Sequence, residues 1–222
     1  MPLSIQWFEK GSKTTEEVYE ILPFLAHLID KLCIDCTEFY PRGFRAYHVK
    51  EIPDITLENY LKRFVKYLEL DEGNLINTLI YMDRFLKKTK LFVTHNTIYG
   101  ILAALFLIEH KFFNDDFYGN KYIADVAGFS IETLNTLEVQ MLYDIEFDLI
   151  IKPEKYSKYH KKVARNAIGW AMVQSKEAGL SHLDTGFESK QDPSQSTYSP
   201  RFHNGSQQEK KLEDTSQLQS TL

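Results

Sequence analysis

The stretch that decides the fold is residues 94–149, THNTIYGILAALFLIEHKFFNDDFYGNKYIADVAGFSIETLNTLEVQMLYDIEFDL. It contains an apolar run, residues 98–108, that carries no charged side chain. The run is too short to span a bilayer, which needs about 20 apolar residues. A helix that is apolar on every side is instead buried within a protein. We therefore predict a fully buried central helix at residues 98–108.

A cation ringed by aromatic residues follows this run. Lys111 is the cation, and five aromatic residues surround it in the sequence: Phe112, Phe113, Phe117, Tyr118 and Tyr122. Glu138 follows between Leu137 and Val139, on the next long predicted helix. Charges at the margin of a core, beside exposed aromatics, are typical of a protein interface. The alternative is a solvated Lys and Glu, at most a surface pair worth about 1 kcal/mol. The residues alone leave both alternatives open.

Outward from this stretch, helical spacing of apolar residues predicts an all-α fold. Thr14 and Glu17 have capping-box spacing and precede a periodic segment that continues to residue 32, with Pro23 either kinking that helix or marking its first turn. Further helices are predicted at residues 55–68 and 75–86, with residues 71–73 between them. Thr94 is predicted to open the buried helix. Gly128 is predicted to end the next helix, and Ser130 to begin the one after it. That second helix carries an apolar set of Leu134, Leu137, Val139, Met141 and Leu142. Pro153 is predicted to begin a last helix that runs to about residue 172.

The predicted organisation is a five-helix bundle around the central helix, flanked by an N-terminal and a C-terminal helix. We divide the chain into a flexible start (1–13), an N-terminal helix and connection (14–53), the helical box (54–152), a C-terminal helix (153–178) and a tail (179–222). Ser, Thr and Gln fill 18 of the 42 positions from residue 181 onward, so we expect the tail to be disordered. Within it, Ser199-Pro200 fits the minimal pattern of a proline-directed phosphorylation site.

Composition and the remaining motifs exclude several classes of function. A net charge of −5 disfavours nucleic acid as the main ligand. Neither a signal peptide nor a segment of transmembrane length is visible, and two cysteines form no disulfide framework, so we expect a cytoplasmic or nuclear location without a membrane partner. Cys33-x-x-Cys36 lacks the second pair that a zinc site needs, and Asp115-Asp116 lacks the calcium-loop pattern. We expect no catalytic residue, metal or cofactor, and therefore no enzyme.

Three motifs, in the right order, resemble the cyclin box, the helical module by which cyclins bind and activate cyclin-dependent protein kinases. Residues 81–86, YMDRFL, resemble the Y-x-D-R-F signature of the second box helix. Lys111-Phe112 resembles the K-F pair that ends the third helix. Residues 137–149 resemble the L-E and F-x-L signature of the fifth helix.

The subtype resembles the P/U-type cyclins, the branch that includes the phosphate-response cyclin of yeast and is tied to nutrient signalling and to cell division. Residues 55–61 (ITLENYL), 111–122 (KFFNDDFYGNKY) and 128–135 (GFSIETLN) carry this similarity. The 56–68 segment departs from cell-cycle cyclins, because it lacks the MRxxL and Trp pattern with which they dock substrates. A single box agrees with the P/U type.

The resemblance implies a kinase regulator without chemistry of its own. Lys111 and Glu138 would reach backbone groups of the kinase beside its movable regulatory helix, and Asp115 would pair with a kinase arginine. The expected kinase-binding residues are Lys111, Glu138, Phe112, Asp115, Tyr118 and Tyr122.

Three alternatives remain at this point. One is a cyclin-fold adapter or scaffold in transcription that does not activate a kinase. Another is a nucleic-acid adapter of the TFIIB kind, which would carry two repeats and a basic face. The last is a small helical enzyme, which would need a pocket with converging titratable groups.

Overall fold

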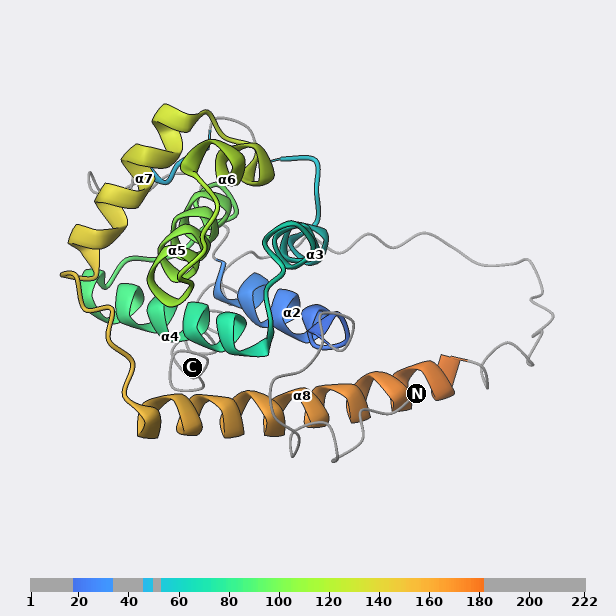
Figure 1. The fold of residues 1–222 in the computed structure, drawn as a ribbon. Coiled ribbons are helices and arrows are strands. Elements are labelled where there is room, and N and C mark those ends of the chain that lie inside the picture. Colours follow the sequence, from blue (N-terminus) through green and yellow to red (C-terminus); the bar gives the residue numbers. More distant parts are fainter. Residues whose placement is uncertain (1–17, 34–45, 50–52, 182–222) are drawn as a thin grey trace, which may run out of the picture.

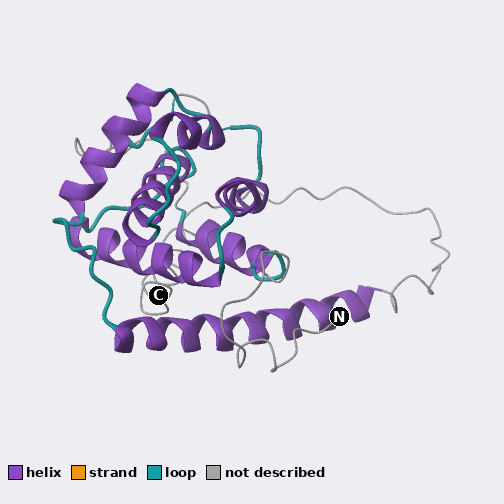
Figure 2. Cartoon of the chain, viewed as in Figure 1, coloured by secondary structure: helices purple, strands orange, loops and turns teal. Residues whose placement is uncertain are grey.

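Seven helices, labelled α2 to α8, make up most of the described part of the chain (Figure 1). The computed structural model describes residues 18–33, 46–49 and 53–181, and the surroundings of side chains as far as residue 176. The helices are α2 (Leu22–Leu32), α3 (Leu57–Leu68), α4 (Glu72–Thr89), α5 (Ile98–Phe113), α6 (Asn120–Ala127), α7 (Ile131–Asp144) and α8 (Pro153–Ser181). Across these residues the chain forms no strand beyond an isolated bridge between Cys33 and Val93, so the predicted all-α class is confirmed (Figure 2).

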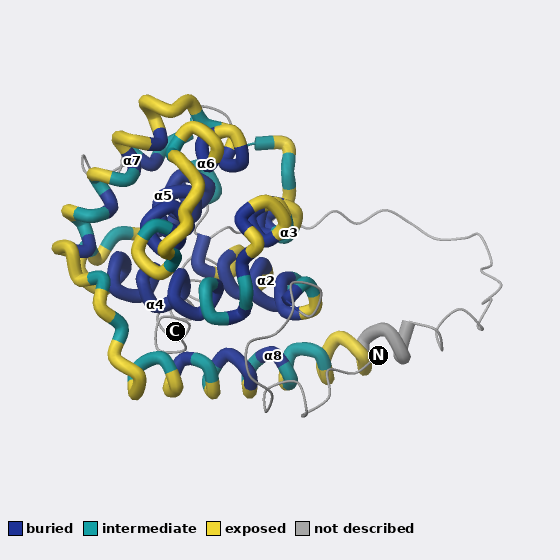
Figure 3. The backbone as a smooth tube through the Cα atoms, in the orientation of Figure 1, coloured by how far each residue is buried: buried dark blue, intermediate teal, exposed yellow. Residues whose placement is uncertain are grey.

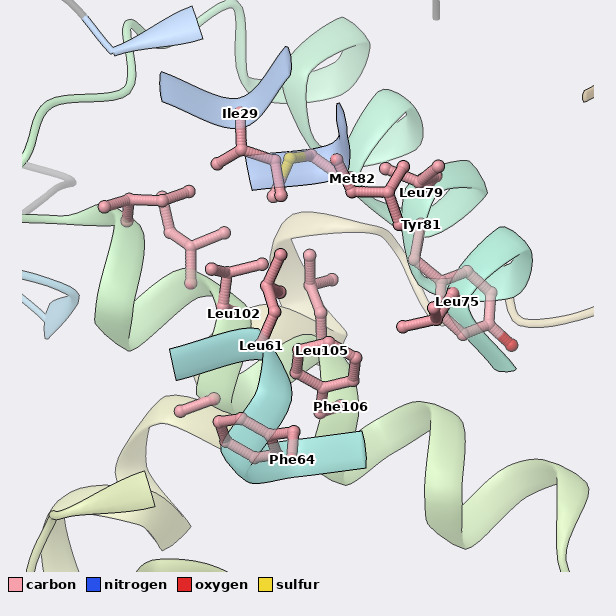
Figure 4. Packing of buried hydrophobic residues seen from close by; sticks show 14 of the residues in the cluster. Ile29, Leu61, Phe64, Leu75, Leu79, Tyr81, Met82, Leu102, Leu105 and Phe106 are labelled. Carbon is pink, nitrogen blue, oxygen red and sulfur yellow. The ribbon is translucent and has the colours of Figure 1, made fainter. Parts of the chain in front are cut away.

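The central helix is α5, as the uncharged run predicted. Every residue from 98 to 110 is buried, and α5 packs against α4, α6 and α7 (Figure 3). Figure 4 shows how α5 packs against α3, with Leu61 and Phe64 of α3 beside Leu102, Leu105 and Phe106 of α5. The Phe64 and Phe106 rings stack with their centroids 4.6 Å apart. Burial of such large apolar side chains is the main source of stability in this fold.

Local sequence features set where several helices begin or end. The Ser130 hydroxyl accepts a hydrogen bond from the Thr133 amide and caps α7, as predicted. Gly128 ends α6 with φ of 78°, a left-handed conformation that glycine adopts without steric cost. Pro153 lies in the first turn of α8, and Pro23 lies in the first turn of α2, which selects one of the two alternatives for that residue.

Two predicted helix starts were wrong by at least three residues. α4 begins at Glu72 and not at residue 75, because Asp71 forms a reciprocal capping box with Asn74. α5 begins at Ile98 and not at Thr94, because the Thr94 carbonyl instead accepts from the amides of Thr97 and Ile98 in a preceding turn. α8 continues to Ser181, past residue 172 and three residues beyond the end of the predicted C-terminal segment at residue 178.

α8 lies along the outside of the bundle against α4 and α2 (Figure 1). Its Tyr159 hydroxyl donates a hydrogen bond to the buried Asp83 carboxylate at 2.5 Å, and its Trp170 ring packs against Phe24 of α2. Thr14, Glu17, Cys36, Ser199 and almost all of the predicted tail lie outside the described residues.

Candidate protein-binding site

The last turn of α5 and the middle of α7 bring Lys111 and Glu138 into direct contact. The Lys111 Nζ donates a hydrogen bond to Glu138 Oε1 at 2.6 Å. The side chain of Lys111 is 30% exposed and that of Glu138 only 15%, so the pair lies at the margin of the core rather than in open solvent. Such a position strengthens the attraction between the two charges relative to an exposed surface pair.

Asn120, at the start of α6, holds the other oxygen of Glu138. Its Nδ2 donates to Glu138 Oε2 at 2.9 Å and to the Asn135 side-chain oxygen at 2.7 Å. Both carboxylate oxygens of Glu138 therefore have a partner from a different helix. Sequence analysis did not identify this role for Asn120, since no spacing rule connects a residue to a side chain 18 positions away.

Exposed aromatic rings follow Lys111 in the chain. Phe112 and Phe113 extend from the end of α5 and pack edge to face, with centroids 5.2 Å apart. Phe117 is exposed in the loop of residues 114–119, between α5 and α6. A patch of exposed aromatics next to fixed charges is the composition that protein interfaces favour at their centres.

Tyr118, Tyr122 and Asp115 lie in the 114–119 loop and in α6, and their environments differ. The rings of Tyr118 and Tyr122 lie 4.6 Å apart, and the Tyr122 hydroxyl donates to the Tyr67 carbonyl of α3. Both tyrosines are thus held by the fold while part of each ring is exposed. Asp115 is exposed in the 114–119 loop.

α7 and the segment that follows it expose further apolar side chains. Val139, a member of the predicted apolar set of this helix, is 53% exposed, because the inward face of α7 is formed by Leu134, Leu137 and Met141. Tyr143 and Phe147 are also exposed and pack edge to face.

The backbone of Phe147 adds to this pattern. Phe147 has φ of 54° and the preceding Glu146 has φ of 55°, both in the left-handed region. This conformation costs a residue with a side chain about 1–2 kcal/mol. A strained backbone that presents an apolar ring to solvent is typical of a functional surface.

The described residues contain no arrangement that a metal site would require. No group of three or more His, Cys, Asp and Glu side chains comes together in residues 18–33, 46–49 and 53–181. Cys33 is buried and its thiol donates to the Ile29 carbonyl. Across the same residues, no helix combines the length and apolar character that a bilayer crossing requires.

Comparison with known proteins assigns the class that this fold and surface define. The cyclin family model matches residues 27–149, just over half of the chain, so the chain belongs to the cyclin family. The matched region contains the central helix, the Lys111–Glu138 pair and the aromatic patch.

The similar proteins are P- and U-type cyclins and a yeast cyclin, as the subtype resemblance predicted. The chain is 29% identical over 113 residues to Cyclin-P3-1 of Oryza sativa subsp. japonica, covering 51% of this chain and 48% of that protein. It is 28% identical over 124 residues to Cyclin-U4-2 of Arabidopsis thaliana, covering 55% and 57%. It is 32% identical over 126 residues to PHO85 cyclin-7 of Saccharomyces cerevisiae, covering 51% and 44%. The chain thus spans about half the length of these curated relatives.

Proposed function

We propose that this protein is a regulatory subunit that binds a cyclin-dependent protein kinase and activates it, in the cytoplasm or nucleus. The observation that carries the proposal is the Lys111–Glu138 pair, fixed from a third helix by Asn120 and bordered by exposed aromatic rings. The yeast relative is named as a cyclin of PHO85, and we extend a partner of the kinase class to this chain.

The paired charges suit a binding role because they are already oriented. A lysine has three N–H donors and a carboxylate has about four lone-pair sites. Contact with each other and with Asn120 leaves Lys111 two donors and Glu138 further acceptor capacity. Charge-assisted hydrogen bonds from these groups to a partner backbone are about twice as strong as neutral ones. The partner would also bury an ion pair that has no net charge, and this costs less desolvation energy than burying a single charge.

The aromatic patch supplies the apolar part of the interface. Phe112, Phe117 and Phe147 expose rings that a partner surface would cover, and each buried aromatic contributes a large apolar area at a small entropy cost. The charged pair sets the orientation of the partner, and the rings supply most of the affinity. In this proposal Asp115, which is exposed in the 114–119 loop, pairs with an arginine of the kinase.

Activation follows from preferential binding to one state of the kinase. A kinase whose regulatory helix is displaced lacks the Lys–Glu pair that positions ATP, and it is inactive. A partner that binds only the inward position of that helix shifts the population by its difference in affinity for the two states. A scaffold would bind both states equally and leave activity unchanged.

Co-purification with cyclin-dependent kinases, followed by a kinase assay with and without this protein, tests the proposal. We expect capture of a kinase of this class and a rise in its activity. The double variant Lys111→Ala, Glu138→Ala should bind at least about 30-fold more weakly, because interface hot spots contribute about 2 kcal/mol or more.

A second Lys–Glu pair of the chain provides the matched control. Lys62 and Glu58 form an ion pair at 2.5 Å on α3, where both side chains are more than a third exposed. The variant Lys62→Ala, Glu58→Ala should bind as the wild type does. Equal binding by both double variants would refute the site, capture without a change in activity would refute activation, and no capture of any such kinase would refute the function.

A further inference from the structure

The 114–119 loop of the candidate site is attached at both ends to one imidazole ring. The backbone amide of Tyr118 donates a hydrogen bond to His110 Nε2 at 3.2 Å. Asn114 Nδ2 donates to the His110 carbonyl at 2.9 Å and lies 3.1 Å from His110 Nδ1, the nitrogen that carries the ring proton when Nε2 accepts. One side chain of α5 therefore contacts the first and the fifth residue of a six-residue loop.

Ring stacking joins the same histidine to the neighbouring helices. The His110 and Tyr118 rings are almost parallel, with an interplanar angle of 7° and centroids 5.4 Å apart. Tyr118 in turn packs on Tyr122 of α6, whose hydroxyl donates to the Tyr67 carbonyl of α3. The loop is thus held by a continuous series of contacts from α5 to α3.

The environment of His110 fits an acceptor at Nε2. A backbone amide is a donor in every state, so the Tyr118 N–H requires an unprotonated Nε2. His110 is only 4% exposed, and this burial lowers the pKa of its ring, which favours the neutral form. A protonated ring would direct an N–H at the Tyr118 N–H and lose this hydrogen bond.

We propose that His110 is a positioning residue, which holds the 114–119 loop in the conformation that presents Asp115 and Phe117 to the kinase. The inference rests on the proposed function. His110 directly precedes Lys111 on α5, so the charged pair and the loop share one rigid support. Without the hydrogen bond to Tyr118, the loop would sample other conformations, and binding would have to pay for ordering it again.

Two substitutions, each made in the whole chain, distinguish the role of the hydrogen-bond acceptor from that of the aromatic ring. His110→Phe keeps an aromatic face against Tyr118 and removes the acceptor. His110→Gln removes the ring but places an amide oxygen where Nε2 lies. We expect amide hydrogen exchange at Tyr118 to be about tenfold faster in His110→Phe and close to wild type in His110→Gln. Kinase affinity should fall about fivefold in His110→Phe, the equivalent of one net hydrogen bond, and return in His110→Gln.

The two readouts distinguish the possible failures. Exchange is measured without a kinase, so it decides the loop assignment even where the proposed function fails. Unchanged Tyr118 exchange in His110→Phe would overturn the proposal. So would a His110→Phe variant that exchanges fast and yet binds the kinase as tightly as wild type. Loss of binding in His110→Gln, with binding kept in His110→Phe, would assign the role to the ring and overturn the acceptor. A wild-type chain that binds no cyclin-dependent kinase would refute the proposed function itself.

Discussion

At the residue scale, Glu109 places an ionisable group in the core beside the candidate site. Its side chain is fully buried in α5, and its carboxylate accepts hydrogen bonds from Asn74 and Asn77 of α4. Burial raises the pKa of Glu109 from 4.5 to about 7, although the two amide hydrogen bonds act in the opposite direction. The group is therefore neutral in mildly acidic solution and charged at higher pH.

This pKa predicts a stability that depends on pH with a definite sign. The folded chain binds the Glu109 proton more tightly than the unfolded chain, so stability is lost as the pH rises from 4.5 through 7. Between pH 5 and pH 8, chemical denaturation should show the unfolding free energy of Glu109→Gln rising by about 2.5 kcal/mol relative to that of the wild type, since each pKa unit corresponds to about 1.4 kcal/mol.

Glu132 provides the control for this measurement. Hydrogen bonds from its own backbone amide and from Ser130 lower the pKa of its exposed carboxylate. The titration of Glu132 therefore affects stability only below pH 4.5. The difference in unfolding free energy between Glu132→Gln and wild type should stay constant from pH 5 to pH 8. A difference for Glu109→Gln that is equally constant would contradict the account of the buried acid.

At the scale of elements, α5 has no room for a larger side chain at Gly100, where the backbone of Tyr47 packs against it. A Cβ at Gly100 would lie 2.7 Å from the Tyr47 carbonyl oxygen, a backbone atom that cannot move away as a flexible side chain would. Gly100→Ala should therefore lower the free energy of unfolding by about 1–3 kcal/mol, as overpacked core substitutions do. Thermal and denaturant unfolding of the full chain measure this loss.

A second helical glycine makes the matched comparison. Gly169 lies within α8, and an added Cβ there would meet nothing within 4 Å. Gly169→Ala should raise the unfolding free energy by up to about 1 kcal/mol, the difference in helix propensity. A stability loss of equal size in both variants would mean that close approach of Tyr47 is not the cause.

The signature residues of α4 serve the fold rather than the interface. The Tyr81 hydroxyl donates to the Leu149 carbonyl, and Arg84 donates to the carbonyls of Asp148 and Ile150. These bonds hold the segment between α7 and α8 against α4. A sequence motif that identifies a family can thus mark a contact within the fold.

At the scale of the whole molecule, the fold was more predictable than the details of the site. The uncharged run of α5 and the terminal residues Gly128, Ser130 and Pro153 each allow few structures, so one sequence was enough to place them. The apolar character of a residue does not by itself show whether its side chain points into the core or toward solvent. Val139 belongs to the apolar set of its helix, and the structure exposes it.

Proximity between distant side chains was the least predictable property. The contact between Lys111 and Glu138 was only one of two alternatives until the resemblance was considered, and even that resemblance assigned them to a partner rather than to each other. The roles of Asn120 and His110 depend on hydrogen bonds between separate elements. Such bonds are decided by packing geometry, which no local pattern encodes.

The central claim is that a cyclin-dependent kinase covers the face formed by Lys111, Glu138 and the aromatic patch. Amide hydrogen exchange of the full chain, free and kinase-bound, tests it most directly. We predict slower exchange in residues 111–122 and in the segment that follows α7, residues 145–148, with no change in residues 165–176 of α8. Protection of α8 together with unchanged exchange in residues 111–122 would contradict the account.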